Sequence, residues 1–294
     1  MYMQHKGWSV REFWHRARDM GFAGIEISHI IWEEDVEGIR PGELPILAVH
    51  APAPKRRGPA GWDAMRDISS PDETKRRWAV AQVEHTIRWA ARMDANLVCV
   101  HMGTVEGIAR EVWALEQRYL AGQRGHPIYE HERERVRAHR ATQAGIHLEA
   151  ARRSLDTLIS LAAKEGVRLG LESRRYFHEI PTLEELEVLL SPYDSTVVGF
   201  WYDVGHCQAL ANLTFIPHEA WWNRVTGRLV GVHVHDVVGL RDHLIPGMGE
   251  VPWKEVKPVL TTADVITFEV DWYFTEEEVQ HGLAYVHRLL SPSS

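Results

Sequence analysis

Short apolar runs alternate along the chain with longer amphipathic stretches that carry most of its charge. Runs rich in Val, Ile and Leu are typical of strands that are buried on both faces of a sheet. Eight such runs predict strands at Tyr2–His5 (the weakest), Ala23–Ser28, Ile46–His50, Leu97–His101, Val167–Glu172, Val197–Asp203, Leu229–His235 and Val265–Val270. Helical periodicity predicts helices at Val10–Met20, Asp72–Met93, Ala150–Glu165, Thr182–Leu190, Pro217–Val225 and Glu276–Leu290. This alternation favours a parallel sheet covered by helices.

The number and spacing of these elements predict the architecture. Eight strands in 294 residues fit an α/β fold of the (β/α)8 TIM-barrel type, which takes about 250 residues, better than an open doubly wound sheet. We find neither a convincing GxGxxG motif after an early strand nor GxxxxGK(S/T), so nucleotide-binding folds lose their main support. Because the sequence contains no Ser- and Gly-rich linker, we expect a single domain over residues 1–294.

Two segments depart from the simple repeat. Residues 50–74 form a long loop with several prolines, and residues 104–145 are longer and heavily charged, with the run EHERERVRAHR at Glu130–Arg140. We favour a solvated helix face for that run, while a lid over the site or an oligomer arm remain alternatives. We therefore expect an extended charged helical excursion after the strand Leu97–His101.

Composition restricts the class of protein. The chain is 45% hydrophobic and 25% charged, as in ordinary globular proteins, and it has only two cysteines, Cys99 and Cys207, too few for a disulfide framework. The N-terminus lacks the apolar region of an export signal, and no stretch approaches the ~20 apolar residues of a membrane helix. We expect a cytoplasmic location and no membrane association. The net charge of −8 disfavours nonspecific binding to polyanions, so a nucleic-acid partner is not expected.

The eighteen histidines exceed what packing needs, and histidine is the commonest metal ligand. Active sites of TIM barrels lie at the C-terminal ends of the strands. Six predicted strands end in His, Asp or Glu, at His50, His101, Glu172, Asp203, His233 with His235, and Glu269. A single polar residue at a strand end is usually a satisfied polar group, but six of them converge here.

Strand alternation sharpens this prediction, because side chains two residues apart point to the same face. The residues two positions before five of these ends are small, namely Ala48, Cys99, Gly170, Gly231 and Thr267. Trp201, two before Asp203, is the exception, and we expect it to fill the space that the small residues leave. Burying three carboxylates and several imidazoles together is unfavourable without a compensating cation. The pattern therefore predicts a divalent-metal site. We interpret Cys99 and Cys207 as packed residues and Glu26 as a support for the rim of the site.

The chain resembles the xylose isomerase-like TIM barrels, a superfamily that includes sugar epimerases, hydroxypyruvate isomerase, inosose dehydratase and endonuclease IV. The matching segments are GFAGIEIS, LAVHAP, NLVCVHMG, LGLESR, GFWYDVGH, GVHVHDVVGLRDHLIPGMGEVPW and ITFEV. The resemblance implies that the shared metal ligands are Glu172, Asp203, His233 and Glu269. Three carboxylates and one imidazole suit Mn²⁺, Mg²⁺ or Co²⁺ and also accept Zn²⁺.

The same resemblance implies an activity: isomerisation or epimerisation of a sugar, keto-sugar or related polyol. Glu172 and Glu269 would then move protons on either side of a metal-bound substrate, through an enediolate that the metal stabilises. His206 resembles a residue that bonds a substrate hydroxyl, and Arg241 lies where some epimerases have a substrate-contacting arginine. His101 and His235 are further candidates for substrate contact. The expected partner is a small sugar-like molecule, and a homo-oligomer remains open.

Other members of the superfamily provide the alternatives. Endonuclease IV holds three zinc ions and uses histidines at the positions of His50, His101, His206 and His243, all of which are present here. Its third metal also uses an Asp at the position of Arg241, and a guanidinium cannot ligate a cation. We therefore favour one ion and leave two or three open. A phosphodiesterase acting on abasic DNA, a dehydratase or lyase acting on a keto-inositol-like substrate, and a non-catalytic metal-binding barrel remain as alternative functions.

Overall fold

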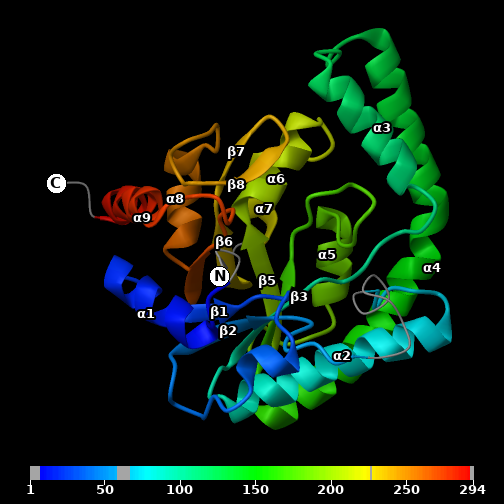
Figure 1. The fold of residues 1–294 in the computed structure, drawn as a ribbon. Coiled ribbons are helices and arrows are strands. Elements are labelled where there is room, and N and C mark those ends of the chain that lie inside the picture. The colour runs from blue at the N-terminus through cyan, green and yellow to red at the C-terminus, as the bar shows by residue number, and fades with distance from the viewer. Residues whose placement is uncertain (1–6, 58–66, 226, 292–294) are drawn as a thin grey trace.

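A parallel barrel sheet forms the centre of the molecule (Figure 1). The computed structural model describes residues 7–57, 67–225 and 227–291. Within them, seven parallel strands pair in the order β1-β2-β3-β4-β5-β6-β9. Their bounds are β1 Ile25–Ile27, β2 Ile46–His50, β3 Leu97–Val100, β4 Arg168–Glu172, β5 Val198–Asp203, β6 Leu229–Val234 and β9 Val265–Phe268. The sheet is nearly closed, which confirms the predicted TIM-barrel architecture and seven of the eight predicted strands. The eighth, Tyr2–His5, lies outside the described residues.

The helices of the described residues surround this sheet, except α3, which lies away from it (Figure 1). They are α1 Val10–Met20, α2 Glu73–Arg92, α3 Ala109–Leu120, α4 Pro127–Glu165, α5 Leu183–Leu190, α6 Val204–Asn212, α7 His218–Val225, α8 Trp253–Leu260 and α9 Glu276–Leu290, with a short 3-10 helix at Glu33–Val36. Side chains at the start of several helices accept hydrogen bonds from the first turn, as Thr275 does from the backbone N–H of Glu278. All six predicted helices are confirmed. An antiparallel hairpin of β7 Asp236–Val238 and β8 Arg241–Leu244 follows β6.

The apolar core has two parts. The larger part lies between the sheet and the helices, and the smaller part fills the inside of the barrel. The inner part consists of Ala48, Leu97, Cys99, Trp201, Val230 and Val265. A Cβ atom added at Gly170 or Gly231 would lie 2.7 Å or 2.5 Å from the ring of Trp201. Only glycine leaves room for this indole, as the sequence predicted, and the inner core forms a solid floor below the strand ends.

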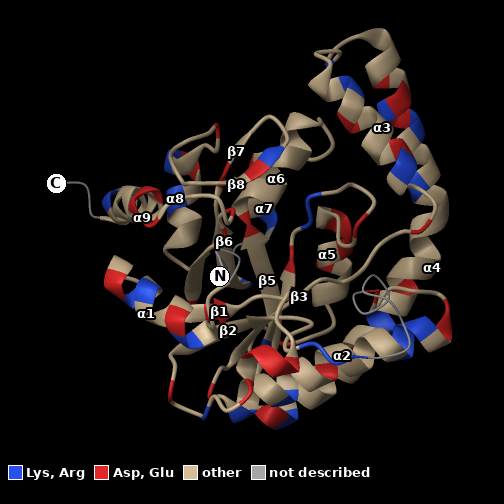
Figure 2. Ribbon diagram, viewed as in Figure 1, with Lys and Arg blue, Asp and Glu red and all other residues tan. Residues whose placement is uncertain are grey.

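The charged excursion is a helical hairpin of α3 and α4 that projects away from the barrel (Figure 1). The predicted helix Ala150–Glu165 is only the C-terminal part of α4, which has 39 residues. Acidic and basic residues are interspersed over the projecting part (Figure 2). Most of Glu130–Arg140 is exposed or half-buried, as a solvated face requires, but Val136 and Arg140 are buried, and Arg140 forms an ion pair with Glu185. Despite the length of α4, none of the described helices has the apolar composition needed to cross a membrane.

Candidate metal centre

The predicted polar strand ends meet at one mouth of the barrel. His50 ends β2, Glu172 ends β4 and Asp203 ends β5, while His233 lies in β6 and Glu269 follows β9. All five side chains are buried. A cleft of about 280 Å³ opens over them. It is lined by His29, His50, His101, Glu172, Arg174, Arg175, Tyr176, His206, Asp242, His243 and Glu269.

Four of these side chains present ligand atoms to one point. Nδ1 of His233 lies 2.9 Å from Oε1 of Glu172, 2.7 Å from Oε2 of Glu269 and 3.5 Å from Oδ2 of Asp203. One ligand atom from each of the four residues lies within 4.8 Å of the others. Among the described residues, the buried Oδ2 of Asp203 and Oε2 of Glu269 accept no hydrogen bond. Buried carboxylate oxygens without a donor are costly, so this group fits a divalent cation.

Asp203 is held in place through its other oxygen. Oδ1 accepts hydrogen bonds from the backbone N–H of His206, at 2.7 Å, and from Nε2 of His235, at 2.9 Å. The first of these bonds caps α6, and Gly205 admits the second, because a Cβ there would lie 2.0 Å from the ring of His235. Burial alone raises the pKa of Asp203, but the neighbouring His206 and His235 outweigh burial and hold this pKa well below its usual range. Asp203 therefore directs an ionised oxygen into the centre.

Glu172 and Glu269 are also ionised. Oε2 of Glu172 contacts the guanidinium of Arg174 and lies 2.6 Å from Nε2 of His101. Burial raises the pKa of Glu172, but Arg174 and His101 lower it further than burial raises it. Burial likewise raises the pKa of Glu269, and His233 and His243 bring it well below the ordinary value. Both carboxylates are therefore able to accept a proton.

A second group of ligand atoms adjoins the first through Glu172. Nε2 of His50 lies 2.7 Å from Nε2 of His101 and 3.8 Å from Oε2 of Glu172. The two imidazole rings meet edge to face, with centroids 4.5 Å apart. These three residues can hold a second cation, with Glu172 shared between the two groups.

The third group, made of His206, His235 and His243, is less suited to a cation. Nδ1 of His235 accepts the backbone N–H of His243 at 2.9 Å, and its Nε2 donates to Asp203. Both nitrogens of His235 are therefore engaged. His206 donates from Nδ1 to the carbonyl oxygen of Ser173 at 3.0 Å, because a carbonyl can only accept. This bond leaves Nε2 of His206 as the acceptor.

Like the buried His235, the predicted substrate contact Arg241 does not line the cleft. It is exposed, and its guanidinium donates to the hydroxyl of Tyr273 at 2.9 Å. Two arginines that the sequence reasoning missed line the cleft instead. Arg174 and Arg175 come directly after Glu172-Ser173. Their position just past a strand end was the signal that could have identified them.

Glu26 does not lie at the rim as the sequence suggested. It is 2% exposed, and its two carboxylate oxygens lie 3.1 Å and 3.3 Å from Nε2 of His233. Burial lowers the pKa of His233, but the carboxylates of Glu269 and Glu26 outweigh burial and raise this pKa well above its ordinary value. Glu26 thus lies beneath the centre, on the side of His233 away from the other three carboxylates.

Known proteins share this architecture. The family model described as "Xylose isomerase-like TIM barrel" matches residues 14–289. A D-tagatose 3-epimerase-like protein superposes with a TM-score of 0.65 at 17% identity, over 96% of this chain and 93% of that chain. The 3-keto-D-glucoside 4-epimerase YcjR from E. coli gives a TM-score of 0.63 at 16% identity, over 95% and 94%. The IOLI protein, solved with a zinc atom, gives 0.66 at 13% identity, over 96% and 93%. No curated protein sequence matches the chain significantly.

Proposed function

Because this chain belongs to the xylose isomerase-like TIM barrel family, we propose that it is a divalent-metal-dependent isomerase or epimerase of a sugar, keto-sugar or related polyol. One observation carries the proposal: four buried side chains aim ligand atoms at one point, and two of their oxygens lack a hydrogen-bond donor among the described residues. The epimerases with the same fold support the substrate class.

Glu172, Asp203, His233 and Glu269 would hold the ion. Three carboxylates and one imidazole suit Mn²⁺, Co²⁺ or Mg²⁺ and also accept Zn²⁺, and the IOLI protein, which has the same fold, was solved with zinc. When bound, such a cation supplies Lewis-acid stabilisation of the negative charge that develops on a substrate oxygen. We favour one ion per chain.

Glu172 and Glu269 are suited to proton transfer by their placement. They approach the centre from β4 and from the end of β9, which are separated in the sheet by β5 and β6. A substrate lying between them would present the carbon next to its carbonyl to both carboxyl groups. One carboxylate would remove the proton from this carbon and later release it to solvent, and the other, after taking up a proton from solvent, would return it on the opposite side. His206 and His101 offer ring nitrogens for the substrate hydroxyls.

The charges around the cleft favour a neutral polyhydroxyl substrate over an anion. Arg174 is paired with Glu172 and Glu179, with its Nη2 2.9 Å from the latter. Arg175 is paired with Glu116 at 2.9 Å and with Asp242 at 2.8 Å. Both guanidinium groups are therefore already neutralised by two carboxylates each, and neither is free to bind a phosphate or carboxylate strongly.

The group of His50, His101 and Glu172 favours a second candidate function. An ion held there beside the first would make a two-metal site of the kind that phosphodiesterases use. The chain would then resemble endonuclease IV more than a sugar epimerase. Elemental analysis of protein purified without added metal separates the two: one ion per chain supports sugar chemistry, and two or three zinc ions support the phosphodiesterase.

The proton-transfer roles are tested by Glu172→Gln and Glu269→Gln. Proton NMR in D2O would follow deuterium incorporation into a panel of ketoses, including tagatose, ribulose and psicose, with Mn²⁺ present. We expect exchange and product formation with the wild type, and at least a ~1000-fold loss with either variant, since an amide cannot accept the proton. Glu277→Gln, an exposed change on α9, is the control and should keep full activity. Near-wild-type turnover by either site variant would contradict the assigned roles.

A further inference from the structure

Glu26 is a buried carboxylate for which the proposed reaction has no use. In β1 its neighbours Ile25 and Ile27 pack into the core between the sheet and the helices, so strand alternation turns Glu26 into the barrel. Its register partner in β2 is Ala48, a member of the inner core. A carboxylate in such surroundings is unfavourable unless its oxygens are bonded.

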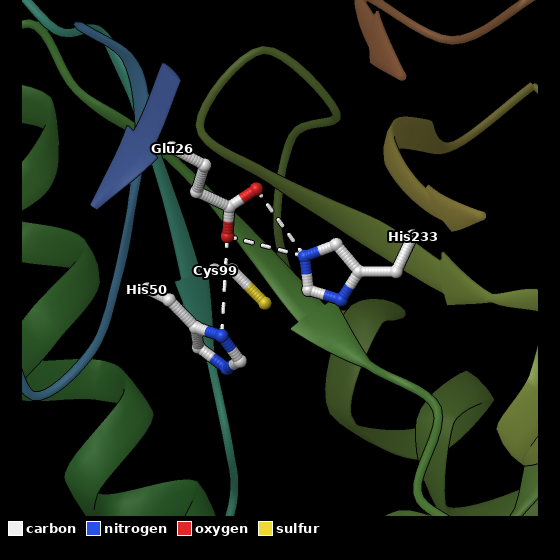
Figure 3. A group of neighbouring side chains, drawn as sticks. All are labelled: Glu26, His50, Cys99 and His233. Atoms are coloured by element: carbon white, nitrogen blue, oxygen red, sulfur yellow. Dashed lines mark hydrogen bonds and ion pairs between the residues drawn. The ribbon is translucent and has the colours of Figure 1, made fainter. Parts of the chain in front are cut away.

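This carboxylate lies between two imidazoles and is hydrogen-bonded to one of them, that of His233. Figure 3 shows Glu26 between His233 and His50, with Cys99 beside them. Its oxygens lie 3.1 Å and 3.3 Å from Nε2 of His233, and Oε1 lies 3.9 Å from Nδ1 of His50. Glu26 thus lies behind one histidine of each of the first two ligand groups.

The bond to His233 determines which ring nitrogen would keep its proton when the ring binds a metal ion. An ionised carboxylate only accepts, so Nε2 of His233 donates to Glu26. Nδ1, on the other side of the ring, is then the nitrogen that faces Glu172, Asp203 and Glu269. A histidine ligand whose second N–H bonds a carboxylate is fixed in tautomer and orientation, and it is a more basic ligand.

The contact with His50 is longer. Oε1 of Glu26 lies 3.9 Å from Nδ1 of His50, and this nitrogen has no hydrogen-bond partner among the described residues. Nε2 of His50 faces His101 and Glu172. The carboxylate on β1 therefore orients the ring of His233 on β6 by a hydrogen bond, and its contact with His50 on β2 is only electrostatic.

We propose that Glu26 is a positioning residue for metal binding: it accepts the Nε2–H of His233 and so presents Nδ1 of that ring to the cation. The inference rests on the proposed metal-dependent function. It also assigns the ion to the first group, Glu172, Asp203, His233 and Glu269. The lower group of Glu26, His50, Cys99 and His233, whose ligand atoms also lie close together, is then a support and not a binding site.

The test compares the affinity of the purified protein for Zn²⁺ by competition with a chromogenic chelator. Glu26→Met removes the acceptor at nearly constant volume and should weaken binding by about 10- to 100-fold. Glu26→Gln keeps an acceptor oxygen and should recover most of this loss. Cys99→Ser is the control in the same cluster and should bind like the wild type. Circular dichroism and thermal unfolding verify that each variant is folded.

A spectroscopic measurement on the wild type keeps the inference testable even if Glu26→Met does not fold. Nitrogen-15 NMR of zinc-loaded protein should show His233 protonated at Nε2 and bound through Nδ1. Binding through Nε2, or equal affinity in wild type and Glu26→Met, would overturn the inference alone. In cobalt-loaded protein, a thiolate-to-cobalt absorption band that Cys99→Ser abolishes would place the ion in the lower group and would also overturn the inference. A wild type that binds no divalent ion would overturn the proposed function as well.

Discussion

Arg140 connects the projecting helix α4 to the loop that carries the arginines of the cleft, and we expect its replacement by Leu to be strongly destabilising. The side chain is 5% exposed. It donates to the carbonyl oxygens of Phe177, at 2.6 Å, and Glu179, at 2.9 Å. It also forms two bonds to the carboxylate of Glu185, at 2.6 Å and 2.8 Å. Glu185 is itself 8% exposed, so Arg140→Leu leaves a buried carboxylate without its cation.

The magnitude follows from this unpaired charge. Removing one partner of a buried ion pair typically costs about 3–5 kcal/mol. Urea unfolding followed by circular dichroism measures it, with Arg135→Leu as the control on the same helix. Arg135 is exposed, so its replacement should change stability by less than about 0.5 kcal/mol. The double variant Arg140→Leu/Glu185→Leu should be less destabilised than the sum of its single changes, because no charge stays buried alone. A loss below about 1 kcal/mol for Arg140→Leu would refute the reasoning.

Three further predictions concern pH, packing and metal. Burial lowers the pKa of His218 to about 3, so as the pH falls the imidazole is protonated in the unfolded chain before it is protonated in the folded one. The free energy of unfolding should therefore decrease below pH ~6.5, by up to about 1.4 kcal/mol per pH unit. Urea unfolding at pH 7 and 5 should show a smaller decrease for His218→Gln than for the wild type. Trp201→Ala should cost about 3–5 kcal/mol, measured by urea unfolding, and Trp201→Phe should cost less; equal losses would contradict the role of the indole as the filler of the barrel. Mn²⁺ at about 100 times its dissociation constant should stabilise the fold by about 2.7 kcal/mol, a thermal shift that a chelator reverses and Asp203→Asn diminishes.

The alternation of apolar strands and helices was enough to predict the barrel. Strands such as Ile46–His50 and helices such as Val10–Met20 and Glu276–Leu290 have the predicted bounds, because each carries a complete period of buried positions and a clear boundary. The inward register of the small residues was predictable for the same reason, since a shift of one residue would turn His50 or Glu172 toward the helices.

Other elements were not predictable from a local pattern. Helix α4 continues through a charged run because its buried contacts come from distant segments: Tyr129 donates to the carbonyl oxygen of Leu213, and Arg140 bonds Glu185. Glu26 occupies the middle position of a strand of three residues, and the sequence does not show whether another side chain inside the barrel bonds its carboxylate. Its role depends on a contact with His233, 207 positions away in the chain.

The centre demands more positive charge than its own side chains supply. Nδ1 of His233 is the nitrogen nearest to oxygens of Glu172, Asp203 and Glu269, and even when it carries a proton, one N–H makes only one well-directed hydrogen bond. Geometry therefore leaves Oδ2 of Asp203 and Oε2 of Glu269 without a donor among the described residues. A divalent cation differs from a proton in this respect, because it coordinates several oxygens at once and does not need a linear donor–acceptor geometry. The barrel brings together oxygens from three strand ends that a proton cannot satisfy and a metal ion can, and this mismatch is the strongest physical reason to expect metal chemistry here.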